Sequence, residues 1–129
     1  MKFNFDEQTL NNLYDNATAE QPQTMVAGLE GDILITVTVD GDIKLPSPKV
    51  TVTYGKLSRI LPSDLDVLQS TVKIFPGLLD WAGMSVTDDN PMYCTLLNVS
   101  ETYTNNISYQ EIVELIENGL KSNNLREVV

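Results

Sequence analysis

The chain has 129 residues, 42% of them hydrophobic and 20% charged, and it carries a net charge of −10 with one cysteine and no histidine. A chain of this length suits one domain that buries a core of its own, and the composition is not that of a disordered protein. The negative charge disfavours direct binding to nucleic acid, and no apolar run reaches the roughly 18 residues that a membrane helix needs. Because residues 1–10 lack the apolar stretch of a secretory signal, we expect a cytoplasmic protein.

A helix is predicted first, over about residues 6–17. Asp6 is the expected N-cap, because its carboxylate can accept hydrogen bonds from the amides of the first turn. Four apolar positions recur at the helical spacing i, i+3, i+4 and i+7: Leu10, Leu13, Tyr14 and Ala17. The segment is therefore predicted to be an amphipathic helix with one buried side.

Strands are predicted next, within residues 24–54. Apolar residues alternate with more polar ones, and the alternation places on one face Ile33, Ile35, Val37 and Val39. Residues 40–42, Asp-Gly-Asp, are predicted to form a three-residue turn, because that length pairs Val39 with Ile43 and keeps one apolar face. The prolines at 46 and 48 indicate a break in strand pairing, since proline has no amide hydrogen to donate.

Three further elements follow along the chain. A helix over about 63–75 is indicated by four apolar residues at helical spacing: Leu65, Leu68, Val72 and Phe75. Residues 92–103 are typical of a strand, and a C-terminal helix over about 108–121 begins with a Ser108–Glu111 capping pattern. Helices and strands are segregated rather than alternating. We therefore predict a single α+β domain, residues 1–129, in which an antiparallel meander of four to five strands packs against two or three helices.

The sequence offers few residue types for catalysis. The absence of histidine removes histidine-based nucleophilic catalysis and histidine metal sites, and one cysteine cannot build a thiolate zinc site. The common glycine-rich phosphate-binding loops are also missing. Cys94 is expected to be buried and inert on its strand. We therefore assign no catalytic, cofactor-binding or metal-binding residue, and we expect a protein that is not an enzyme.

Close pairs of carboxylates are the remaining candidates for a site. Paired carboxylates can bind a hard cation or perform acid–base chemistry, but each pair falls in a predicted turn or helix cap, where Asp is favoured for backbone reasons. Asp64 and Asp66 are assigned to the cap of the second predicted helix. The other acidic residues are our candidates for binding a partner: Glu30, Asp32, Asp40, Asp42, Asp88 and Asp89.

Three functions fit these observations. The preferred hypothesis is a small acidic binding protein, an inhibitor or immunity-type protein that docks on a basic protein surface. One form of it is a nucleic-acid mimic from a phage or mobile element, whose carboxylates stand in for phosphates and occupy a nucleic-acid-binding enzyme. The first alternative is a structural assembly subunit, of a virion or scaffold, that forms homo-oligomers through its strand edges. The second is a small carboxylate-dependent enzyme.

Overall fold

The computed structural model describes residues 1–18, 20–42, 45–105 and 107–125. Its elements in chain order are β1 (Lys2–Phe3), α1 (Glu7–Asn16), β2 (Gln23–Glu30), β3 (Ile33–Asp40), β4 (Lys49–Ser58), α2 (Leu65–Gln69), β5 (Thr71–Lys73), the 3-10 helix η1 (Asp80–Ala82), β6 (Tyr93–Tyr103) and α3 (Tyr109–Ser122). The strands form one antiparallel sheet in the order β1-β2-β3-β4-β6-β5. The predicted α+β class is confirmed, and within the described ranges the sheet has six strands rather than four to five.

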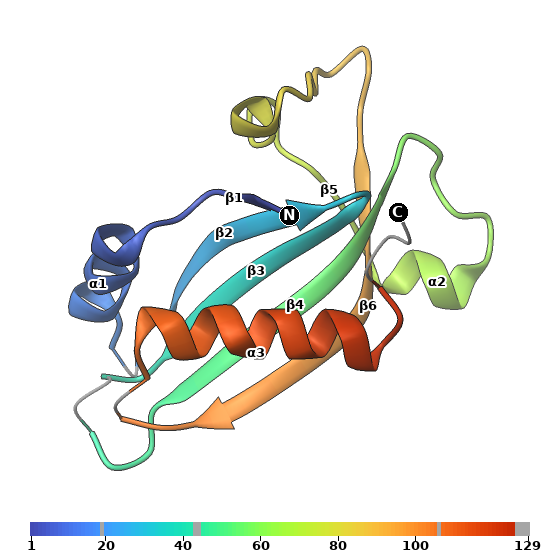
Figure 1. Cartoon of the computed structure of the whole chain (residues 1–129). Helices are drawn as coiled ribbons and strands as arrows, with labels where there is room; N and C mark the ends of the chain where they lie inside the picture. Colours follow the sequence, from blue (N-terminus) through green and yellow to red (C-terminus); the bar gives the residue numbers. More distant parts are fainter. Residues whose placement is uncertain (19, 43–44, 106, 126–129) are drawn as a thin grey trace.

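Two helices cover one face of this sheet. α3 crosses the front of the strands and α1 lies beside β2 (Figure 1). The alternating residues of β3 and β4 point into this layer and are completely buried against the helices, which gives the main core: Ile35, Val37, Val39, Val50, Val52, Tyr54, Leu10, Ile112, Ile116 and Leu120. The period-2 pattern of the strands and the period-3.6 pattern of the helices thus meet in one apolar layer.

Both long helices begin at the caps predicted from the sequence. Asp6 accepts a hydrogen bond from the Thr9 amide at 2.8 Å, and the Thr9 side chain accepts one from the Asp6 amide. At α3, the Ser108 hydroxyl accepts from the Glu111 amide at 3.2 Å. Each cap satisfies an amide that the first helical turn leaves without a partner. None of the described helices is long and apolar enough to cross a bilayer.

On the opposite face of the sheet, the cover that the described residues provide lies near the β2–β3 turn. There the segment of residues 74–92, which includes η1, lies over the sheet and appears at the top of Figure 1. It forms a second, smaller core with strand residues of the opposite parity: Leu29, Leu34, Leu57, Ile74, Leu79, Ala82, Val86 and Met92. The rest of this face, which carries threonines at 24, 36, 38, 51 and 53, is only partly covered or exposed.

α3 lies close against β4 at Gly119. The Tyr54 side chain is fully buried under the helix, and its hydroxyl donates to the Ile116 carbonyl at 3.4 Å. A Cβ at position 119 would overlap the Tyr54 hydroxyl oxygen and lie 2.6 Å from Cζ. Burial also raises the pKa of Tyr54 to about 12. Glycine at this helical position therefore permits the close approach of helix and strand.

The helix predicted over 63–75 is much shorter in the structure. α2 ends at Gln69, and residues 71–73 form β5, which pairs with β6. At the end of the helix the Val67 carbonyl accepts from the Ser70 amide at 3.0 Å and from the Thr71 hydroxyl at 2.8 Å. Val72 and Phe75, which completed the helical stripe, lie outside α2 and are exposed.

The predicted turn at residues 40–42 is also corrected. Val39 pairs with Val50 and Asp40 with Lys49, so the whole stretch 41–48 is the connection between β3 and β4. Ile43, the predicted partner of Val39, lies outside the described residues. The connection contains both prolines, as expected, and it begins at Gly41, whose φ of 96° suits glycine.

Candidate functional site

The structure does not bring the six predicted partner-binding acids together. Glu30 and Asp32 lie at the β2–β3 turn, whereas Asp40 and Asp42 lie at the other end of β3. The eight residues of β3 separate these ends by about 26 Å, at about 3.3 Å per residue. A charged partner would therefore meet two acidic sites, not one.

Local contacts occupy several of these acids. The Glu30 carboxylate forms an ion pair with the amino group of Met1 at 3.3 Å and is largely buried. Asp40 is partly buried, opposite Lys49 in the β3–β4 register. Asp88 and Asp89 stand in an exposed turn closed by a hydrogen bond from the Asn90 amide to Thr87 O. Ion pairing, strand pairing and turn formation thus explain why several of the predicted acids occur where they do.

The turn that carries Asp88 and Asp89 lies toward the same end of the sheet as Asp32. It is held there by Arg59, whose guanidinium donates to the Asn90 carbonyl at 2.7 Å and to the Ser85 carbonyl at 2.8 Å. Arg59 follows β4 directly, and the nearby Leu57 amide donates to the Asp32 carbonyl at 2.7 Å. Together with Glu30, these three aspartates place four of the six predicted acids at one end of the sheet, and Asp40 and Asp42 lie at the other.

Asp64 caps its helix as expected from the sequence, whereas Cys94, which is expected to be buried, is only partly buried in the structure. The Asp64 carboxylate accepts from the Asp66 amide at 2.9 Å and caps α2. Cys94 pairs with Leu57 across the sheet, and burial raises the pKa of its thiol. Its sulfur occupies the space that a Cβ at Gly55 would need. In the described ranges, no group of three or more His, Cys, Asp or Glu side chains is placed to hold a metal ion.

An apolar groove lies on the partly covered face, between the sheet and the beginning of the 74–92 segment. Its volume is about 960 Å³. The floor includes Leu34 and Leu96, and Phe75 and Leu78 contribute from the segment that crosses the sheet. Among the described residues that line it, Lys73 is the one charged residue and none is acidic, although the chain carries a net charge of −10. The groove therefore differs in character from the rest of the surface.

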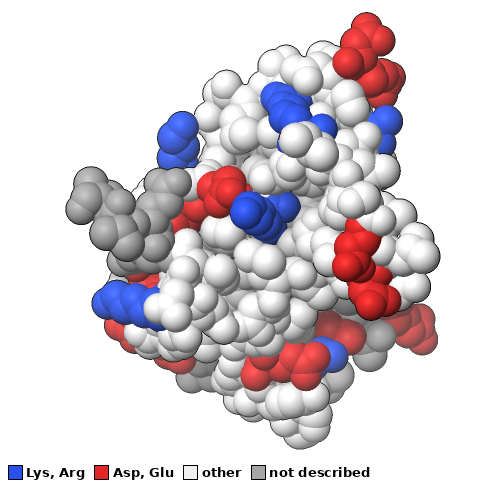
Figure 2. Space-filling model, turned by 90° about the vertical axis from the view of Figure 1, so that its right-hand side faces the viewer, with Lys and Arg blue, Asp and Glu red and all other residues white. Residues whose placement is uncertain are grey.

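The groove belongs to a larger uncharged surface around α2, β5 and the middle of β6. Of the twelve large apolar side chains that are exposed among the described residues, nine lie here: Ile60, Leu61, Leu65, Val67, Val72, Phe75, Leu96, Leu97 and Val99. We call this set the α2–β6 apolar surface. Figure 2 looks onto this side of the molecule, where uncharged residues predominate and acidic residues form several separate groups. Exposed apolar patches of this extent mark interaction sites in soluble proteins.

The charges within this surface cancel. Residues 58–75 and 96–99 contain two acids, Asp64 and Asp66, and two bases, Arg59 and Lys73. The net charge of −10 therefore comes entirely from the rest of the chain. A second acidic protein can approach this side without meeting a net negative charge.

Beside this surface, β6 presents an open edge. β5 pairs only with Tyr93–Thr95, and the Leu96 amide donates to the Ser70 carbonyl at 2.8 Å. From residue 97 to residue 103, no described strand pairs with β6 on the side away from β4. In Figure 1 this half of β6 forms the lower margin of the sheet. An edge of this length is a template for strand addition.

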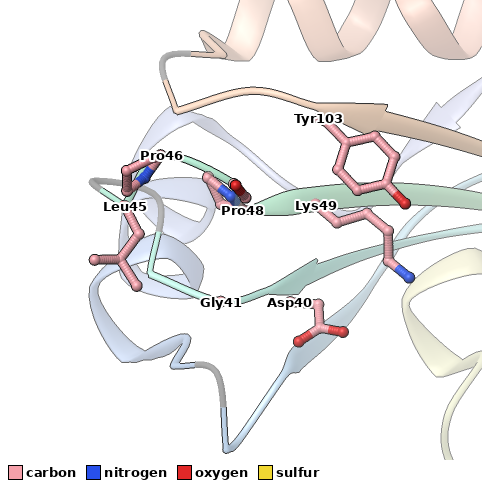
Figure 3. A pocket seen from close by; sticks show the side chains of 8 residues that line it. Asp40, Gly41, Leu45, Pro46, Pro48, Lys49 and Tyr103 are labelled. Atoms are coloured by element: carbon pink, nitrogen blue, oxygen red, sulfur yellow. The ribbon is translucent and has the colours of Figure 1, made fainter.

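A second, smaller pocket of about 460 Å³ lies where β6 ends. Figure 3 shows Tyr103 and Lys49 side by side on neighbouring strands, with Leu45 and Pro46 in the β3–β4 connection. Tyr103 and Leu45 are themselves exposed apolar residues, and Pro48 lies between them, buried. The open edge of β6 thus has an apolar feature at each end: the groove at one end and this pocket at the other.

Little in the residue pattern indicates these features. Val72 and Phe75 fit a helical stripe in the sequence but are exposed in the structure, and the free length of β6 depends on which strand pairs with it. The residue pattern holds one related signal, because residues 58–75 carry two acids and two bases and are therefore neutral in a chain of net charge −10. Comparison with family models, curated proteins and solved structures finds no match to the chain.

Proposed function

We propose that this chain is a non-enzymatic protein that acts by binding other protein surfaces. The observation that carries the proposal is the α2–β6 apolar surface, on which Phe75 is 77% and Val72 is 63% exposed. Exposing such side chains to water costs free energy, about 25 cal/mol per Å² of apolar area, that burial in an interface recovers. The α2–β6 apolar surface is the principal contact in this proposal, and association of subunits is the function that it favours.

The acidic ends of the molecule support a second candidate, the inhibitor or immunity-type protein that docks on a basic partner. Asp32, Asp88 and Asp89 share one end of the sheet, and the net charge outside the α2–β6 apolar surface is −10. Electrostatic docking of this kind weakens as salt is added, because mobile ions screen exposed charges. Hydrophobic association does not weaken in this way.

Capture of binding partners from the native source, with three forms of the chain, tests this proposal. One variant carries Val72→Ser and Phe75→Ser, and the matched acidic variant carries Asp88→Asn and Asp89→Asn. All four positions are exposed, so both variants should fold. We expect a specific partner that is retained in high salt and lost with the serine variant.

The outcome also separates the two candidate modes. A partner lost with the asparagine variant and in high salt would support electrostatic docking instead. Equal capture by all three forms, at every salt concentration, would contradict both modes.

A further inference from the structure

The open edge of β6 points to a specific occupant. We propose that a second copy of this chain pairs antiparallel with residues 97–103, so that the two six-stranded sheets join across a two-fold axis into one continuous sheet. This inference rests on the proposed function, because it names the partner of the α2–β6 apolar surface. A two-fold axis makes the interface self-complementary and closes the assembly at two copies.

The backbone of β6 is suited to this pairing. The Thr104 amide donates to the Pro48 carbonyl at 3.1 Å and thus points toward β4. Because backbone groups alternate between the two sides of a strand, the amides of Val99, Glu101 and Tyr103 point outward. The Val99 amide donates at 2.7 Å to its neighbour's side chain, Asn98 Oδ1, as expected for a group that β4 does not bind. The outward amides of one copy can donate to the outward carbonyls of another.

One register fits the side chains best. Centring the two-fold axis on Ser100 places Val99 opposite Glu101, and Leu97 opposite Tyr103, of the other copy. Centring it on Glu101 would instead set two carboxylates directly opposite each other, which is unfavourable. The Glu101 carboxylate is already partly neutralised by Lys49 Nζ at 3.7 Å. The Ser100 register therefore places Leu97 against Tyr103 and keeps the two Glu101 carboxylates apart.

This register also uses the apolar features at both ends of the edge. Tyr103 of one copy lies beside Leu97 of the other, next to the point where Ser70 joins α2 to the sheet. The pocket lined by Tyr103 and Leu45 thus comes next to the exposed α2 side chains of the other copy, Leu65 and Val67. The pocket of each copy therefore meets the α2 side chains of the other, so the two-fold axis produces this contact twice.

Charge and apolar exposure favour a second copy as the occupant. Like chains of net charge −10 repel each other, but the segments that form this surface have no net charge. The Ser100 register brings into the interface apolar side chains that are each between 40% and 73% exposed in the single chain, so their burial is favourable: Leu45, Leu65, Val67, Leu97, Val99 and Tyr103. A second copy would therefore cover exposed apolar side chains as well as the open strand edge.

Sedimentation velocity of the purified chain, from micromolar to millimolar concentration, tests the pairing with two substitutions at one position. Glu101→Pro removes an outward amide and leaves the hydrogen bonds to β4 in place, because proline is tolerated where an edge amide faces solvent. Glu101→Gln removes the charge and keeps the amide. We expect a concentration-dependent dimer for the wild type and the glutamine variant, and at least about a tenfold weaker dimer for the proline variant.

Disulfide trapping tests the register without relying on the proline variant. Across the two-fold axis the Cα atoms of Ser100 would be about 4.5 Å apart, within the range that a disulfide spans. Those of Thr102 would be offset by four residues, about 13 Å. Under mild oxidation we expect Ser100→Cys to form a covalent dimer, and Thr102→Cys and the wild type, with Cys94 alone, to remain uncrosslinked.

Three results would overturn this pairing. They are a wild type that stays monomeric at every concentration, a Thr102→Cys chain that crosslinks as fast as Ser100→Cys, and a folded proline variant that dimerises like the wild type. A monomeric chain whose partner capture still depends on Val72 and Phe75 would refute self-pairing and leave the proposed function standing. A monomeric chain whose partner capture is unchanged by substituting Val72 and Phe75 would refute both self-pairing and the proposed function.

Discussion

Substituting Gly119 by alanine tests how tightly α3 is seated on the sheet. Alanine normally stabilises a helix interior relative to glycine, by about 0.5–1 kcal/mol. Here the new methyl group would overlap the buried Tyr54 hydroxyl, and Tyr54 is completely enclosed between β4 and α3. Overpacking of this kind costs about 1–3 kcal/mol, which exceeds the helical gain. We therefore expect Gly119→Ala to lower the free energy of unfolding by about 1–2 kcal/mol.

Urea unfolding followed by circular dichroism measures this change. With a slope of about 1–3 kcal/mol per molar urea, the midpoint should fall by roughly half to one molar. Tyr54→Phe in the Gly119→Ala background removes the clashing hydroxyl and should restore part of the loss, with a coupling of about 1 kcal/mol in the double-mutant cycle. Asn118→Ala, at an exposed position of the same helix, is the matched control and should be neutral or slightly stabilising. A Gly119→Ala chain as stable as the wild type would refute the reasoning.

Three further predictions follow from other contacts. The free energy of unfolding should fall as the pH rises above about 10, because the pKa of Tyr54 is about 12 in the folded chain and its ordinary value is 10.0, so the unfolded chain releases the proton first. Urea titrations at several pH values should show a smaller fall for Tyr54→Phe than for the wild type. Ser108→Ala should cost about 1 kcal/mol, since it removes the acceptor of the Glu111 amide, and thermal unfolding measures that loss. Asn98→Ala should free the Val99 amide for strand pairing and tighten the dimer roughly three- to tenfold, as sedimentation equilibrium would show; an unchanged or weaker dimer would count against the edge model.

The elements that were predicted correctly are those whose signals are local. Asp6 and Ser108 start helices because each has the side-chain oxygen that the first turn needs. The alternation through residues 33–39 survives in β3 because the whole apolar side is covered by helices. In these segments the local preference and the tertiary environment agree, so the element can be predicted from the sequence alone.

The errors arose where long-range pairing overrides a local pattern. The helical spacing of Val72 and Phe75 is real, but Thr71–Lys73 gains the hydrogen bonds of β5 by pairing with β6. The same apolar residues that suggest a buried helix are therefore exposed on the surface. Likewise, Val39 requires an apolar cross-strand partner, and Val50 supplies it from beyond the prolines. A one-dimensional pattern identifies the face of a strand but not the strand with which it pairs.

The candidate site depended even more on tertiary structure. The acids at Asp32 and Asp40 are close in sequence, yet a whole strand holds them at opposite ends of the sheet. The open edge of β6 exists because β5 stops after three residues. Neither fact is visible from residue types, although the neutral stretch 58–75 in an acidic chain marks the region where the apolar surface lies.

Hydrogen exchange at individual amides, at low and high protein concentration, tests most directly whether the chain acts through the open side of β6. The Glu101 and Tyr103 amides point outward and the Thr102 amide points toward β4, so the three neighbours report on the two edges of one strand. We expect Glu101 and Tyr103 to exchange fast in dilute solution and to become protected as concentration rises, with Thr102 protected throughout. Fast exchange of Glu101 and Tyr103 at every concentration would contradict the account.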